Sequence, residues 1–374
     1  MKKSQLVYID KNPCWVAFLH PFTFVVPDDE NPWEVKLEEI NNVSYRSGNL
    51  IRVVTKIDIP NCELPALICY DGAIAIPRNE NFPSKESALN YFCDFFVKLL
   101  FAGFNIEGID HKDIVTGNLH EKWAIWPTNL GESSISQTHS KIRMLVASNM
   151  DTIQLSNPRI VRVKELKEKL TNGSSILEKI PNLTPKFLLR GITEFRYKNW
   201  DLVLSNLWIT VEQLIDYLWH FRFLSNESFH PLEDIPNRKK SMKDDSRTWT
   251  ASVKQEILFQ SKILSEEILH NLNEARKTRN KLVHEGKSVS QEIATSILET
   301  TIKLIQIVSN SVKIDFLVKR KKHAENIAKR KFKIDFNDWK DLPESKIIEN
   351  VFGDEITQKL KISTAPKGFA KRRG

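Results

Sequence analysis

The sequence contains no long uninterrupted apolar run, which argues against a membrane-spanning helix. None of its 374 residues belongs to an apolar stretch approaching the roughly 20 residues that cross a bilayer. The start of the chain, Met1-Lys2-Lys3, is basic, but Asp10 and Asn12 interrupt the apolar residues that follow, so no signal peptide is evident. We therefore expect a cytoplasmic protein without a membrane partner.

Cysteine is also scarce, and its spacing excludes the usual metal and disulfide frameworks. The four cysteines, Cys14, Cys62, Cys69 and Cys93, form no C-x-x-C pair and have no histidine at zinc-site spacing. They are typical of reduced, mostly buried thiols. We expect no metal site and no cofactor.

Excess charge is missing from most of the chain and concentrated at its end. The composition, 41% hydrophobic and 27% charged, is that of an ordinary globular protein. The net charge is +8, and residues 313–374 alone hold 17 Lys and Arg against 9 Asp and Glu. The remainder is balanced, which indicates a polyanion-facing C-terminal segment at 316–374.

The first half of the chain predicts an α+β domain over residues 1–180. Apolar runs at 15–19 and 22–26, and an alternating pattern at 51–59, predict strands. Asp71-Gly72 predicts a tight turn between two further strands. A helix is expected from Ser84 to Ala102, stopped by Gly103. We interpret residues 129–140 as a loop and 171–175 as a break.

The second half predicts an all-α bundle of four to five helices over residues 185–315. Helical patterns cover 187–197, 200–223, 247–264, 265–285 and 288–313, the last with a capping box at Ser288 and Gln291. Polar residues 226–245 predict a surface excursion between two of these helices. The chain is long enough for such separate cores.

A short motif, residues 276–286, closes the helix that begins near Ser265. On a helical wheel, Arg279 falls within an apolar face. That face comprises Ile268, Leu269, Leu272, Ala275, Leu282 and Val283. A guanidinium there needs a carboxylate, a subunit interface or a phosphate. Asn280 and His284 are four residues apart and share one flank, with Arg276 between that flank and Arg279. Gly286 predicts the helix stop.

An Arg and a His held together without metal ligands suit phosphoryl chemistry on RNA. Cleavage needs the ribose 2′-OH deprotonated, the phosphorane charge stabilised and the 5′-oxygen protonated. His284 can exchange a proton near neutral pH, and Arg279 offers donors matched to phosphate oxygens. Asn280 can hydrogen-bond the scissile phosphate or orient the imidazole.

The stretch Arg-Asn-Lys-Leu-Val-His-Glu-Gly at 279–286 resembles the R-N-x-x-x-H motif of the HEPN superfamily. Residues 199–219, with Glu212 inside, resemble the first long helix of its ApeA-like branch. The resemblance covers about 185–315 and implies a metal-independent endoribonuclease that leaves 2′,3′-cyclic phosphates. It implies catalytic roles for Arg279 and His284, with Asn280 assisting and Glu212 as an acid that pairs with Arg279.

The resemblance also implies a homodimer joined through the helical bundle, with RNA as substrate and a role in anti-phage defence or toxin-like growth arrest. We expect a phage-derived or regulatory trigger to act at the N-terminal domain. Arg276 and Lys281 are the expected RNA-binding or supporting residues.

Structural interpretations of the same residues stay open. Arg279 can be one half of a buried ion pair with Glu212, His284 a helix-end residue, and Arg276 a solvated cation. The alternative function is a non-catalytic dimeric adaptor that binds RNA or a nucleotide. The two hypotheses differ in whether Arg279 is paired with Glu212 or available to substrate.

Overall fold

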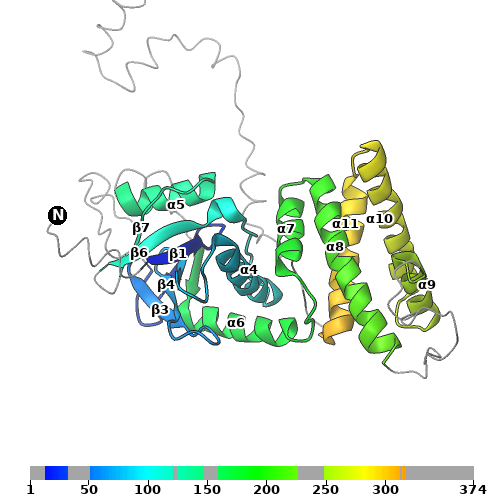
Figure 1. Cartoon of the computed structure of the whole chain (residues 1–374), viewed down its shortest axis with the longest axis horizontal. Coiled ribbons are helices and arrows are strands. Elements are labelled where there is room, and N and C mark those ends of the chain that lie inside the picture. The colour runs from blue at the N-terminus through cyan, green and yellow to red at the C-terminus, as the bar shows by residue number, and fades with distance from the viewer. Residues whose placement is uncertain are drawn as a thin grey trace, which may run out of the picture. The chain divides into compact units, whose positions relative to one another are not determined.

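The structure, a computed structural model, describes residues 13–32, 51–120, 124–145, 159–225 and 248–311, together with Ile314 and Phe316. A β-rich N-terminal region built on an antiparallel sheet is followed by a helical C-terminal region (Figure 1). The expected excursion at 226–245 and, apart from Phe316, the basic segment at 316–374 lie outside the described residues.

The main sheet has six strands in the order β3-β4-β5-β1-β6-β7, paired antiparallel throughout. The strands are β1 Pro13–Phe18, β3 Val53–Ile57, β4 Ala66–Cys69, β5 Ala73–Pro77, β6 Val115–His120 and β7 Ala124–Pro127. A separate parallel pair joins β2 Thr23–Val26 to β8 Arg159–Arg162. The runs expected at 15–19, 22–26 and 51–59 are thus strands, and the predicted turn at Gly72 has φ of 78°.

Alternate residues of β1 enter two different hydrophobic clusters. Trp15 and Ala17 belong to the larger cluster, which includes helix α4 Lys85–Phe101, whereas Val16 and Phe18 belong to a smaller one on the other face. This period of two is what a strand buried on both faces requires. Helix α4 begins after its N-cap Ser84, as expected.

Helix α5, Ser134–Leu145, occupies much of the stretch expected to be a loop at 129–140, so that expectation is wrong for residues 134–140. Its position is fixed by Arg143, which is 1% exposed and donates from Nε and Nη2 to the two carboxylate oxygens of Asp71, each at 2.6 Å. The partners lie 72 residues apart, so local sequence cannot reveal the contact. The short 3-10 turn His111–Asp113 (η1) precedes β6.

Helix α6, Val163–Leu177, runs through the expected break at 171–175 without interruption. Gly173 is buried, and a Cβ placed on it would lie 1.8 Å from the carbonyl oxygen of Lys98 in α4. The glycine therefore permits a close crossing of α4 and α6 and does not end the helix.

The helical region consists of α7 Pro185–Arg196, α8 Trp200–Tyr217, a π-helical turn η3 Leu218–Phe223, α9 Ala251–Gln260, α10 Glu266–Glu285 and α11 Gln291–Ser309. Helix α8 packs against α7, α10 and α11 (Figure 1). Its expected buried face is confirmed; the residues are Val203, Leu207, Val211, Leu214, Ile215 and Leu218. The expected cap of α11 at Ser288 is wrong, because Ser290 is the N-cap and accepts a hydrogen bond from the Ile293 N–H.

One hydrophobic core runs from the sheet through α4 and α7 into α8 and α11. Gly108 and Gly191 lie at close approaches within it: added Cβ atoms would lie 3.1 Å from Leu189 and 2.4 Å from Leu207, respectively. Helix α7 is therefore packed tightly on both sides. Among the described residues, no helix combines the length and apolarity needed to cross a membrane.

Candidate nucleic-acid interface and active site

Helix α10 carries the R-N-x-x-x-H motif in its last turns and is well defined at both ends. The hydroxyl of Ser265 accepts a hydrogen bond from the Ile268 N–H at 3.4 Å, and Glu266 and Glu267 follow in the first turn. Gly286 ends the helix with φ of 66°, and its N–H donates to the Leu282 carbonyl at 3.1 Å. Both ends agree with the sequence, because Ser and Gly are the preferred residues at these positions.

The packed face of α10 passes directly into the motif. Ile268, Leu272 and Ala275 are buried, and Arg279 is the next position of this stripe at a spacing of four residues. Arg279 is half-buried and makes no ion pair with any residue that the structure describes. Without a carboxylate among the described residues, the guanidinium donors of Arg279 are left to solvent or to a ligand.

Glu212 does not have the expected role of partner to Arg279. It is exposed on α8, and its Oε1 accepts a hydrogen bond of 2.8 Å from Trp208 Nε1. Residues 208 and 212 are one helical turn apart, so this contact satisfies both side chains within α8 itself. The structural interpretation that buries Arg279 against Glu212 is therefore wrong.

The remaining motif side chains are accessible. Asn280, Lys281 and His284 are exposed, whereas Arg276 is half-buried and donates from Nη2 to Asn273 Oδ1 at 2.9 Å. Asn280 and His284 lie one turn apart on the same flank. Arg279 and His284 are separated by five positions, which in an α-helix correspond to about 140° of rotation and about 7.5 Å of rise. One helix therefore presents these two groups on different sides.

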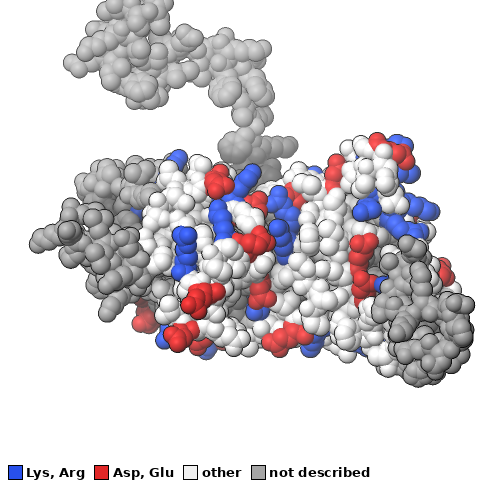
Figure 2. All heavy atoms as spheres, in the orientation of Figure 1, with Lys and Arg blue, Asp and Glu red and all other residues white. Residues whose placement is uncertain are grey.

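Positive charge is concentrated on the C-terminal half of α10, and Figure 2 shows the Lys and Arg side chains gathered over that helix. The cations of this half are Arg276, Lys277, Arg279 and Lys281. None of them forms a salt bridge within the part of the chain that the structure describes, whereas the nearby Lys287 pairs with Glu285 at 2.6 Å. We call these four residues the α10 cation cluster; cations without salt bridges, gathered on two turns of one helix, suit a polyanion.

Next to the α10 cation cluster, the same helix exposes an apolar side chain. Val283, expected on the apolar face, is 57% exposed, and Leu202 in the first turn of α8 is 45% exposed. The start of α8 and the connection that follows α10 are joined by a hydrogen bond of 2.6 Å from the Val289 N–H to Asp201 Oδ1. Sequence analysis did not identify Asp201, and its only local signal is an acidic residue in a first helical turn.

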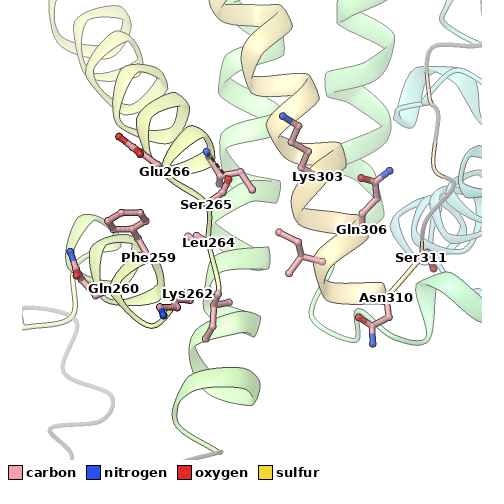
Figure 3. Close-up of a pocket in the computed structure, with 13 residues that line it drawn as sticks. Phe259, Gln260, Lys262, Leu264, Ser265, Glu266, Lys303, Gln306, Asn310 and Ser311 are labelled. Carbon is pink, nitrogen blue, oxygen red and sulfur yellow. Dashed lines mark hydrogen bonds between the residues drawn. The ribbon is translucent and has the colours of Figure 1, made fainter.

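The open groove on this helix lies at its other end. A cavity of about 930 Å³ is bounded by the α9–α10 connection and the end of α11, with Phe259, Lys262 and Gln306 among its lining residues (Figure 3). Ser265 lines it as well, so the groove lies about 30 Å along α10 from His284 at 1.5 Å per residue. The motif is therefore not part of this groove.

Two further observations concern ligands and relatives. Within the described ranges, no group of three or more His, Cys, Asp or Glu side chains could hold a metal ion. Comparison with known proteins finds no match to any protein-family model, curated protein or solved structure. The residues and their arrangement are therefore the basis for inferring function.

Proposed function

We propose that this protein is a metal-independent HEPN-type endoribonuclease that acts as a homodimer and cleaves RNA through the ribose 2′-OH. The observation that carries the proposal is Arg279: it is half-buried on the packed stripe of α10 and has no carboxylate partner among the described residues. A phosphate group accepts hydrogen bonds from the guanidinium of Arg279. The same guanidinium then stabilises the negative charge that develops on the phosphorane during cleavage.

In the proposed reaction, the 2′-oxygen attacks phosphorus while the bond to the 5′-oxygen breaks. His284, exposed in the last turn of α10, exchanges protons with these two oxygens. Asn280 donates a hydrogen bond to a phosphate oxygen, and Arg276 and Lys281 hold neighbouring phosphates. The products are a 2′,3′-cyclic phosphate and a 5′-OH, so no external oxidant or hydrolytic water is needed.

The separation of Arg279 from His284 supports a dimeric site. Because the two side chains point about 140° apart on one helix, a twofold axis beside α10 is a simple way to bring an arginine and a histidine to one phosphate. Exposed Val283 and Leu202 supply apolar area for such an interface. A role in anti-phage defence or growth arrest belongs to the same proposal, carried by the resemblance of residues 279–286 to the HEPN superfamily motif.

The test is cleavage of a mixed RNA panel in the presence of EDTA, with mapping of the 3′ ends. Wild type should release 2′,3′-cyclic phosphates, and Arg279→Ala or His284→Ala should lower the rate by at least 100-fold, the scale on which a single catalytic group acts. His270→Ala is the matched control, because His270 is an exposed histidine on the same helix. Equal cleavage by all four proteins contradicts the proposal. Salt-dependent RNA binding without cyclic ends supports the adaptor instead.

A further inference from the structure

A second cavity lies in the N-terminal region, away from the motif. It has a volume of about 830 Å³ and is formed by the β3–β4 connection, the β5–α4 connection, α4 and α6. We propose that this cleft binds an organic cation, namely an alkylammonium or guanidinium group carried on a short apolar stem. The proposal does not rest on the ribonuclease function, because none of the lining residues belongs to the motif.

The cleft is a product of tight packing beneath it and a fixed loop above it. Gly173 allows α6 to approach the Lys98 carbonyl of α4, and Lys98 and Ser174, which lie beside this crossing, line the cleft. On the opposite side, Asn61 adopts φ of 59°, and its carbonyl accepts a hydrogen bond of 3.0 Å from Asn81 Nδ2. Three segments far apart in sequence are thereby held around one space, as in a preformed ligand site.

Aromatic rings form the inner wall. Phe82 and Phe95 are buried, and Tyr91 is half-buried between them, with ring centroids 5.4 Å from Phe82 and 6.3 Å from Phe95. The phenol of Tyr91 is neutral at physiological pH, and burial, then the neighbouring Asp94, raise its pKa further above the ordinary value. A neutral phenol ring attracts a cation at its face and packs against an apolar stem.

The rim carries two carboxylates, Asp58 and Glu178, that form no salt bridge within the described ranges. Lys98 is the cationic side chain among the lining residues, and its charge is neutralised by a salt bridge of 2.5 Å to Asp94. Among the described residues, Asp58 forms no ion pair, and Glu178 accepts a hydrogen bond of 3.3 Å from the Ser174 hydroxyl but has no cationic partner. Both are exposed, so the open side of the cleft is negative while its depth is aromatic. This combination complements a cation with a hydrocarbon stem and disfavours phosphates and carboxylates.

The test is calorimetric titration of the full chain, without RNA, using agmatine, putrescine and the capped tripeptide acetyl-Gly-Arg-Gly-amide. The diamine and guanidine arms test a free small molecule, and the tripeptide tests an arginine presented by a protein. We expect saturable binding of at least one cation and none of 1,4-butanediol, its neutral analogue. The double substitution Asp58→Asn, Glu178→Gln should weaken binding at least tenfold.

Glu63→Gln is the matched control, because it removes one exposed carboxylate from the same β3–β4 connection without touching the cleft. It should leave binding within twofold of wild type. Wild type that binds none of the cations overturns the proposal, as does an equal loss with Glu63→Gln, which would indicate nonspecific charge. If the double variant does not fold, NMR of wild type decides the question. Ligand-induced chemical-shift changes of the Asn81 side-chain amide support binding in the cleft, and unchanged shifts reject it.

Discussion

Asp201 Oδ1 accepts a hydrogen bond of 2.6 Å from the backbone N–H of Val289. Val289 is 5% exposed and lies between Gly286, which ends α10, and Ser290, which caps α11. The first turn of α8 therefore fixes the short connection that follows His284. Because α8 also packs against α7, the end of the motif helix is tied to the same rigid core as the N-terminal region.

Removing this carboxylate should loosen the end of α10. We expect Asp201→Ala to lower the free energy of unfolding by about 1.5–3 kcal/mol, the range for a hydrogen bond to a charged group. Denaturant unfolding measures the loss, and hydrogen exchange at the Val289 amide locates it. Asp201→Asn, which keeps a side-chain oxygen as acceptor, should recover most of the protection. Unchanged exchange at Val289 in Asp201→Ala contradicts this role.

The separation of Arg279 from Glu212 leads to a second prediction. Glu212→Gln should change the unfolding free energy by less than about 0.5 kcal/mol, because the site is exposed and glutamine keeps an acceptor for Trp208. Arg279→Met should also fold stably, since no buried carboxylate loses its partner, yet should abolish RNA cleavage.

Denaturant titration measures the unfolding free energies of Glu212→Gln and Arg279→Met, and the RNA cleavage assay with EDTA measures their activity. A loss of about 3–5 kcal/mol in Glu212→Gln is what breaking a buried ion pair costs, and would restore the structural interpretation of Arg279. Full RNA cleavage by Arg279→Met would remove the main support for the ribonuclease. The two substitutions thus distinguish a structural arginine from a catalytic one.

The parts of the fold that local sequence specifies were predictable. Ser265 and Gly286 bound α10 because capping is a local interaction, and the buried face of α8 follows from its periodicity. The same periodicity places Arg279 on the packed stripe of α10. That no described carboxylate pairs with Arg279 did not follow from the sequence, because whether an acid on α8 reaches it depends on the rotation of one helix against another.

The two misassigned segments, 134–140 and 171–175, share one physical cause, namely contacts between residues far apart in sequence. Polar residues 134–140 form part of α5 because Arg143 is anchored on Asp71 across the sheet. Asn172-Gly173 has the composition of a turn, yet it lies within α6 because α4 passes too close for any side chain. In both cases a tertiary contact outweighs local propensity.

The substitution Gly173→Ala separates helix propensity from the tertiary contact with α4, because the two effects change the free energy of unfolding in opposite directions. In an unconstrained helix, replacing glycine by alanine stabilises by about 0.5–1 kcal/mol. Here the added Cβ would lie 1.8 Å from the Lys98 carbonyl oxygen, so we expect Gly173→Ala to destabilise by about 1–3 kcal/mol or more. Ser175→Ala, at an exposed position of the same helix, is the control and should stay within about 0.5 kcal/mol. Thermal or denaturant unfolding measures both, and a more stable Gly173→Ala would contradict the close crossing.

His139 predicts how stability depends on pH. It is 2% exposed and stacks on Phe18 and Phe22, with ring centroids at 4.3 and 4.7 Å. Burial, and then the nearby His20 and Arg143, lower its pKa well below the ordinary value. The folded state therefore keeps the imidazole neutral, while the unfolded chain binds a proton below about pH 6.5. Stability should fall as pH decreases from that value until the folded pKa is reached.

At pH 5.5 this one histidine should cost on the order of 1 kcal/mol relative to neutral pH, because that pH lies below the pKa of an unfolded histidine while burial disfavours the proton in the folded state. His139→Phe keeps an aromatic ring in the stack, and its loss of stability between pH 7.5 and 5.5 should be smaller than that of wild type by about this amount. Burial also lowers the pKa of His20, so part of the slope should remain in the variant. His270→Gln, at an exposed site, should retain the wild-type slope. Parallel pH profiles for wild type and His139→Phe would show that His139 is protonated without cost in the folded protein, contrary to its burial between two phenyl rings.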